Sequence, residues 1–273
     1  MWVSAANLRA ALADATARFG FSPTARLDAE LLMAHALGID RNALLLDMER
    51  PVPATFAGLV ERRAAHEPVA YITGTRGFWT IDLSVGPGAL VPRPDSETLL
   101  IAALAHFGNR APATVLDLGT GPGTLLLAAL DEWPARGIGV DRSAQALAYA
   151  TSNATALGMA HRTAFARGDW AAAIDARFDL VLANPPYIGT DEPLPPQVLD
   201  HEPPQALFAG ADGLDDYRRI VPALPALLAT GGAAILEIGW TQGSAVSLLA
   251  QEQGLSSSVY KDMGGRPRVV RLT

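Results

Sequence analysis

The chain contains no cysteine among its 273 residues. Disulfides and metals held by cysteine are therefore excluded. There are five histidines, and none of them stands at the spacing of a paired metal ligand. We therefore expect no metal centre in this protein.

The chain also lacks an excess of basic residues. Its formal net charge is −7; the part up to Pro92 has 8 basic and 9 acidic residues, and the remainder has 13 and 19. A protein that grips nucleic acid without sequence preference needs lysine and arginine against the phosphates. The charge balance argues against DNA or RNA as the substrate, although an acidic total can hide a local basic patch.

No segment has the layout of a secretion signal or a membrane span. Asp14 and Glu30 interrupt the N-terminal region, where a signal peptide would have a continuous apolar run. The uncharged stretch 220–236 contains two prolines and two glycines and is short for a membrane span. Hydrophobic residues make up 49% of the chain and charged residues 18%, which is typical of a globular protein. We expect a cytoplasmic protein with no membrane partner.

Residues 1–67 have the periodicity of helices. Apolar side chains recur at helical spacing from Leu8 to Ala15 and again from Leu27 to Leu37, and Gly38 ends the second run. This helical domain is either a packing subdomain or a partner-recognition module, because an enzyme that acts on a protein needs docking surface beyond its pocket.

Residues 68–92 are rich in β-forming side chains between glycines, which indicates a β-hairpin linker. The segment 92–97, Pro-Arg-Pro-Asp-Ser-Glu, follows the linker. Its prolines stiffen a turn, and we expect Asp95 or Ser96 to cap a helix that runs to Phe107.

Strands and helices alternate in the remaining part, which we assign to a catalytic domain over 93–273. This alternation predicts an α/β, Rossmann-like fold with a mainly parallel sheet and helices on both faces. Helices are expected between the strands, among them one over 215–228. The predicted strands are 114–118, 137–140, 163–166, 178–183, 233–238, 257–261 and 268–272.

A glycine-rich loop over 119–123, Gly-Thr-Gly-Pro-Gly, follows the first of these strands. Such glycines let the backbone pass close to a ligand at the carboxyl end of a strand. A dinucleotide site prefers G-x-G-x-x-G, whereas here the spacing is G-x-G-x-G. Asp117 lies just before the loop, and a carboxylate there suits a ligand with a positive amino group better than a pyrophosphate. The loop alone is also compatible with a simple strand-to-helix turn.

Two further strand ends carry groups that suit a nucleoside. Asp141 follows the second strand and could accept hydrogen bonds from both ribose hydroxyls, or could instead cap the helix from Ser143. Trp170 follows the third strand and could stack on an adenine, or could be a residue at the edge of the core. The three strand ends together favour S-adenosylmethionine over NAD.

The tetrapeptide Asn184-Pro185-Pro186-Tyr187 follows the fourth strand. A nitrogen conjugated to a carbonyl or an aromatic ring is a poor nucleophile, because its lone pair is delocalised. Acceptors that hold both of its N–H groups can orient it for attack on a methyl group. The Asn184 side-chain oxygen and the Pro185 carbonyl are candidate acceptors, and Tyr187 offers a flat face for stacking. The alternative to a catalytic role is a simple proline-rich turn after a strand, and the preceding glycine loop disfavours it.

At this point the chain resembles the release factor glutamine methyltransferases over nearly its whole length. The flanks of the tetrapeptide carry the resemblance, because the tetrapeptide itself is shared with DNA adenine methyltransferases and several RNA methyltransferases. The resembling segments are Pro68–Gly74 with Phe78, Val91–Glu97, Glu202–Phe208, Asp212–Arg218, Glu237–Gly239 with Gln242, and Gly265–Arg268.

The resemblance implies a class I methyltransferase fold with a seven-stranded sheet. It also implies methylation of the glutamine in the Gly-Gly-Gln motif of class 1 peptide chain release factors, with the helical domain helping to grip that partner. We expect a monomer that binds no nucleic acid directly. Pro122 departs from the family pattern, which has serine or threonine there. The residues implied for catalysis and substrate binding are Asn184, Pro185, Pro186 and Tyr187; those implied for S-adenosylmethionine are Gly119, Thr120, Gly121, Pro122, Gly123, Asp141, Trp170 and Asn184.

Three other functions make different demands on the sequence. Methylation of an exocyclic amine on adenine or guanine uses the same chemistry but predicts a basic surface. An NAD-dependent dehydrogenase would need a hydride-handling site that the sequence does not offer. A non-catalytic binding protein with the same fold would not need the intact tetrapeptide.

Overall fold

The structure is a computed structural model that describes residues 7–273. It divides the chain into two units: a helical unit, which extends to Thr75 and also includes Pro195–His201, and a sheet unit made of Arg76–Leu194 and Glu202–Thr273. A short segment from the middle of the chain therefore belongs to the N-terminal helices.

The helical unit is built around one apolar core, with Leu12, Phe19, Leu32 and Met33 fully buried. The helices are α1 (Leu8–Arg18), α2 (Ala25–Leu37), α3 (Arg41–Leu46), α4 (Phe56–Ala64), α5 (Val69–Thr73) and the short α9 (Pro196–Leu199). In α1 the buried positions Leu8, Leu12 and Ala15 match the predicted periodicity. In α2 the prediction was wrong in part, because Leu27 is exposed and Leu32 and Met33 enter the core instead.

A buried ion pair crosses the helical unit. Arg63 of α4 lies 2.8 Å from the Asp28 carboxylate of α2, and both side chains are almost fully buried. Ser22 donates a second hydrogen bond to Asp28, and Arg63 also donates to Gln197 of α9. The pair therefore fixes α2, α4 and α9 to one another.

The expectation that residues 69–73 are part of a β-hairpin is wrong. They form helix α5, which starts after Pro68 and ends at Gly74 with φ +75°. Ile72 joins the core of the helical unit, so tertiary burial outweighs the β propensity of the segment. The hairpin is shorter than predicted and consists of β1 (Thr75–Phe78) and β2 (Ile81–Ser84).

The sheet unit contains a seven-stranded sheet in the order β5-β4-β3-β6-β7-β9-β8. Neighbouring strands from β5 to β7 pair in parallel, and β9 pairs antiparallel with β7 and β8. The mainly parallel, Rossmann-like sheet is therefore confirmed. The strands are β3 (Thr114–Leu118), β4 (Arg136–Asp141), β5 (Thr163–Arg167), β6 (Phe178–Ala183), β7 (Leu228–Glu237), β8 (Ser257–Lys261) and β9 (Pro267–Leu272).

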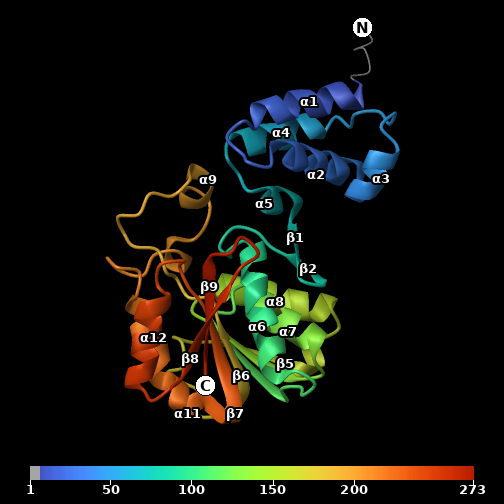
Figure 1. Ribbon diagram of the computed structural model, residues 1–273. Coiled ribbons are helices and arrows are strands. Elements are labelled where there is room, and N and C mark those ends of the chain that lie inside the picture. The colour runs from blue at the N-terminus through green and yellow to red at the C-terminus, as the bar shows by residue number, and fades with distance from the viewer. Residues whose placement is uncertain (1–6) are drawn as a thin grey trace. The chain divides into compact units, whose positions relative to one another are not determined.

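Helices cover both faces of this sheet (Figure 1). The green helices α6 (Glu97–Phe107) and α7 (Thr124–Glu132) lie on one side, and the orange α11 (Leu224–Leu227) and α12 (Gly243–Glu252) lie on the other. Helix α8 (Ala144–Ala156) packs against β4 and β5.

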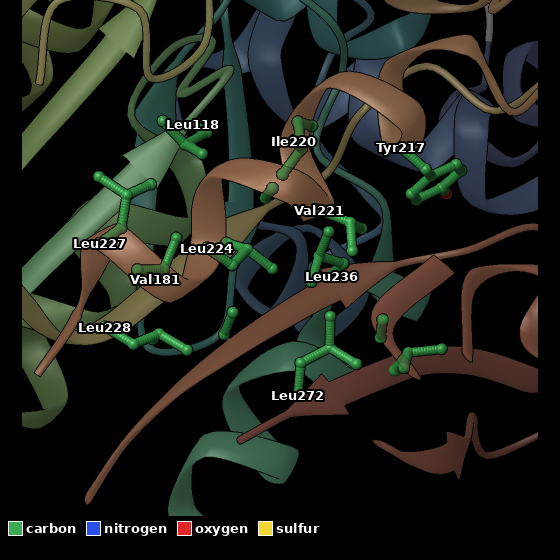
Figure 2. Close-up of a cluster of buried hydrophobic side chains, with 14 of the residues drawn as sticks. Leu118, Val181, Tyr217, Ile220, Val221, Leu224, Leu227, Leu228, Leu236 and Leu272 are labelled. Carbon is green, nitrogen blue, oxygen red and sulfur yellow. The ribbon is translucent and has the colours of Figure 1, made fainter. Parts of the chain in front are cut away.

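The single helix expected over 215–228 is interrupted. It consists of α10 (Asp215–Ile220), a 3₁₀ turn (Val221–Ala223) and α11, because Pro222 and Pro225 remove backbone donors from a longer helix. Figure 2 shows its apolar side chains, from Tyr217 to Leu227, gathered against sheet residues such as Val181, Leu236 and Leu272. Proline thus changes the local geometry and leaves the buried face of the segment intact.

Strands β3 and β6 lie side by side in parallel, although β4 and β5 separate them in sequence. Their carboxyl ends therefore meet at the place where the strand order reverses, which is where open α/β sheets bind ligands. The glycine loop follows β3 and the tetrapeptide follows β6. Within the described part of the chain, no helix has the length and apolar character needed to span a bilayer.

Candidate active site

The loop after β3 depends on its glycines. Gly119, Gly121 and Gly123 have φ of +74°, +56° and +86°, which side chains other than glycine rarely adopt. A Cβ added to Gly119 would lie 2.9 Å from the Trp170 ring, and one on Gly123 would lie 2.8 Å from Leu127. The backbone of the loop is therefore held closely against its neighbours.

Asp117 lies under this loop and is completely buried. One of its oxygens accepts hydrogen bonds from the Thr120 hydroxyl at 2.7 Å and from the Leu126 amide at 3.2 Å. The other oxygen has no hydrogen-bond partner among the described residues. Burial raises the pKa of Asp117 from 3.8 to about 7, and its hydrogen bonds from Thr120 and Leu126 oppose the rise.

Pro122 turns its only polar backbone atom towards the protein. Its carbonyl accepts a hydrogen bond of 2.9 Å from the Asn153 side chain of α8, and Asn153 also pairs with the backbone of Ser84. The departure from the family pattern at Pro122 therefore removes an N–H, while its carbonyl is occupied by Asn153.

Asp141, the last residue of β4, binds the same loop through its side chain. One carboxylate oxygen accepts from the Gly121 amide at 2.8 Å and the other from the Ser143 amide at 2.8 Å. The N-cap of α8 is Ser143, whose hydroxyl accepts from Ala146, so Asp141 itself is not the helix cap. Each Asp141 oxygen keeps further acceptor capacity towards the cavity that it lines.

Trp170 lines this cavity and also packs against the core, as expected of a residue at the edge of the core. Its stacking on an adenine stays a prediction. Its backbone has φ +49°, and its ring nitrogen donates to Asp216 at 3.0 Å. Burial raises the pKa of Asp216, and the hydrogen bond from Trp170 opposes that rise. The ring is therefore fixed in orientation on one side of the cavity.

Two neighbouring cavities meet at the carboxyl ends of β3 and β6. The larger has a volume of about 90 Å³ and the smaller a volume of about 50 Å³. Asp141, Trp170 and Pro186 line the larger cavity, whereas Asp117 and Thr120 line the smaller. The residues that line both are Leu90, Gly119, Gly121 and Asn184.

Asn184 stands where the two cavities join. Its side-chain amide donates to the Ser96 hydroxyl at 3.3 Å, and its Oδ1 accepts no hydrogen bond from any described residue. Pro185 and Pro186 are buried, and the Pro185 carbonyl likewise accepts no hydrogen bond from the described part of the chain. The first two residues of the tetrapeptide thus offer two uncommitted acceptor oxygens.

Tyr187 is anchored at both ends. Its hydroxyl donates to the Glu237 carboxyl at 3.3 Å, and its backbone carbonyl accepts from Gln242 Nε2 at 2.8 Å. Burial, and then the nearby Glu237 charge, raise the pKa of Tyr187, so the phenol stays neutral. These anchors hold the ring in one orientation.

Glu237 is a buried carboxylate beside the tetrapeptide, at 1% exposure. Burial raises its pKa from 4.5 to about 7, while Ser96, Arg268 and Tyr187 favour its ionised form. Its backbone carbonyl accepts from the Tyr217 hydroxyl at 2.7 Å. Glu237 therefore joins the end of β7 to the tetrapeptide and to α10.

The sequence did not point to Ser96, Glu237 or Gln242 as parts of the site. Each lies in a segment that carried the family resemblance, and this was the only signal available for them. Ser96 occupies the N-cap position of α6, as expected, but its side chain makes no cap bond there and its hydroxyl meets Asn184 instead.

Comparison with known proteins identifies the family to which this site belongs. Residues 10–74 match the model of the PrmC N-terminal domain, and residues 110–233 match that of a methyltransferase domain. The release factor glutamine methyltransferase of Cereibacter sphaeroides is 46% identical over 271 residues, covering 96% of this chain and 95% of the relative. The chain belongs to the release factor glutamine methyltransferase family. A second member, from Rhodospirillum rubrum, is 44% identical over 89% of this chain and 77% of its own length.

Solved structures that resemble this methyltransferase support its class I fold. The ribosomal protein L11 methylase of Lactobacillus delbrueckii has a TM-score of 0.50 at 21% identity, covering 69% of this chain and 83% of its own. A T. thermophilus 16S rRNA N2 G1207 methyltransferase, solved with AdoMet and guanosine, has a TM-score of 0.52 at 20% identity, covering 72% and 49%. At these identities the likeness concerns the fold alone.

Proposed function

We propose that this protein uses S-adenosylmethionine to methylate the side-chain amide nitrogen of the glutamine in the Gly-Gly-Gln motif of class 1 peptide chain release factors. Membership of the family supports a release factor as the substrate. The observation that carries the chemistry is the pair of uncommitted acceptors, Asn184 Oδ1 and the Pro185 carbonyl, beside an anchored Tyr187 ring.

The residues around the two cavities fit S-adenosylmethionine. Asp141 would accept from the ribose hydroxyls, and Trp170 would stack on the adenine. The unpartnered Asp117 oxygen in the smaller cavity suits the amino-acid end, whose ammonium group would lower the raised pKa of this carboxyl. The backbone of the loop that contains Gly119, Thr120, Gly121, Pro122 and Gly123 would approach the cofactor closely, with Asn184 at the junction.

The tetrapeptide would hold and orient the acceptor amide. When bound, the cofactor supplies a methyl group activated by the sulfonium charge. Asn184 Oδ1 and the Pro185 carbonyl would each accept one N–H of the glutamine amide, and Tyr187 would pack on its plane, with Pro186 closing the turn. Positive charge that develops on the nitrogen lies next to two oxygen dipoles that are already in place. No strong general base is required, because the proton can leave after transfer.

We also propose that the helical domain, residues 1–67, is the substrate-recognition domain, joined by the linker 68–92 to the catalytic domain 93–273. The match of residues 10–74 to a dedicated N-terminal domain model supports a role beyond packing. The acidic charge of the chain is consistent with a protein that binds no nucleic acid. That it is a monomer and needs no metal stays a prediction.

Transfer of a radiolabelled methyl group to purified release factor tests this function. We expect labelling of the native factor and none of a variant in which Gly-Gly-Gln is changed to Gly-Gly-Ala. Adenine-containing DNA and RNA serve as parallel acceptors. Labelling that survives the change to alanine, or that appears mainly on nucleic acid, would contradict the proposal.

A further inference from the structure

The segment 93–97 has no role in the function proposed above, yet each of its charged and hydroxyl side chains binds a different part of the sheet unit. Arg93 pairs with the buried carboxylate of Glu202, which also accepts from the Val91 amide. Asp95 lies 3.2 Å from Arg268, and Glu97 accepts from the Trp79 amide at 2.9 Å. The turn that contains Ser96 is therefore fixed by ionic and backbone contacts on both sides.

Ser96 stands between this rigid turn and the tetrapeptide. It is 3% exposed, and its hydroxyl accepts the hydrogen bond from Asn184 Nδ2 at 3.3 Å. Ser96 also lines the smaller cavity together with Asn184.

We propose that Ser96 is a positioning residue for methyl transfer, because it selects the orientation of the Asn184 amide that turns Oδ1 towards the substrate. This inference rests on the proposed function. An asparagine amide has two orientations related by a half-turn, and only one presents its oxygen to a substrate N–H. The bond from Asn184 Nδ2 to the Ser96 oxygen leaves Oδ1 facing away from Ser96. The flipped orientation would direct Oδ1 at Ser96 and give up this bond.

The arrangement also accounts for the buried carboxylate at the end of β7. Glu237 accepts from the Tyr187 hydroxyl at 3.3 Å and so holds the aromatic face, while Ser96 holds the amide. The stacking ring and the acceptor amide of the tetrapeptide are thus each held by a buried side chain.

The test is a double-mutant cycle between Ser96→Ala and Asn184→Ala, measured as single-turnover and steady-state methylation of release factor. We expect Ser96→Ala to lower kcat about tenfold, with KM for the release factor and Kd for S-adenosylmethionine changed less than about threefold. In the Asn184→Ala background the same substitution should change kcat by less than about twofold, because the residue through which Ser96 acts is gone. Ser96→Thr keeps the hydroxyl and should recover most of the lost rate.

Thr98→Val is the matched control, since Thr98 is a buried hydroxyl residue on the same helix with no side-chain hydrogen bond among the described residues. It should leave kcat unchanged, and thermal melting of each variant reports on folding. Three outcomes would overturn the positioning role. Ser96→Ala could lower kcat by the same factor in the Asn184→Ala background, or it could change only the Kd for S-adenosylmethionine. The third is a folded Ser96→Thr variant that does not recover the rate. Failure of the unmodified enzyme to methylate the native factor would instead overturn the proposed function.

Discussion

The Gln242 side chain holds the backbone on both sides of the active-site loop, and its removal is the most informative structural perturbation. Its amide nitrogen donates to the Tyr187 carbonyl at 2.8 Å and to the Gly213 carbonyl at 3.2 Å, and its oxygen accepts from the Gly239 amide at 2.9 Å. Gln242→Ala leaves all three backbone groups without this partner.

The magnitude follows from the number of bonds and their exposure. Three hydrogen bonds at about 1 kcal/mol each set an upper value of about 3 kcal/mol, and access of water to this half-buried side chain reduces the loss to about 2 kcal/mol. For a domain of this size we expect a fall in Tm of about 4–8 °C. Because Tyr187 loses its backbone anchor, we also expect methyl transfer to slow by about tenfold.

The assay combines thermal melting with steady-state methylation of release factor. Gln251→Ala is the matched control, because Gln251 is exposed on the same helix and has no side-chain hydrogen bond among the described residues. Gln242→Glu keeps the size but turns an acceptor towards two carbonyl oxygens, so it should be at least as harmful as alanine. If Gln242→Ala melts and reacts like Gln251→Ala, the reasoning is refuted.

Three further predictions concern other parts of the chain. Gly119→Ala should weaken S-adenosylmethionine binding by at least about tenfold in calorimetry, because φ is +74° and the new Cβ would meet Trp170 at 2.9 Å. Glu237 has its pKa raised from 4.5 to about 7, so its contribution to stability is full below about pH 4.5 and is lost as pH rises through about 7; chemical denaturation should detect a loss on the order of 3 kcal/mol. Asp28→Asn leaves Arg63 buried without its charged partner, and proteolysis or hydrogen exchange should report a helical unit that is less stable by about 3–5 kcal/mol.

Each of these three has its own check. Gly108→Ala is the control for Gly119→Ala, because Gly108 also has a positive φ but has open space around it. It reports the effect of backbone strain alone, without damage to the cofactor site. Glu237→Gln should reduce the pH dependence without abolishing it, because the pKa of the buried Asp117 is also raised to about 7; an unchanged slope would argue against a contribution from Glu237. Asp40→Asn, at an exposed helix cap, should have a much smaller effect than Asp28→Asn, and equal effects would argue against the buried pair.

The parallel sheet could be predicted because its strands are short apolar runs that alternate with helices. The sequence placed the glycine loop after the strand 114–118 and the tetrapeptide after the strand 178–183, and the structure shows that these two strands are neighbours. Strand β7 begins five residues before its predicted start at 233, because a register shift opposite β6 allows a glycine-containing segment to pair. A period of two cannot reveal such a bulge.

The parts that could not be predicted depend on contacts that are distant in sequence. Ser96 has the chemistry of a helix cap, and only the folded chain shows that its hydroxyl meets Asn184, 88 residues away. Gln242 lies 55 residues from Tyr187, and Gln197 lies 134 residues from Arg63. Helix α5 was misassigned because Ile72 gains more from burial in the helical core than from its strand propensity.

The most direct test of the central claim is single-turnover methylation of release factor by Asn184→Ala beside the unmodified enzyme, with S-adenosylmethionine affinity measured on both. If Asn184 Oδ1 orients the glutamine amide, the chemical step should slow by about a hundredfold or more while the protein stays folded. A near-normal rate of the chemical step in Asn184→Ala would contradict the account.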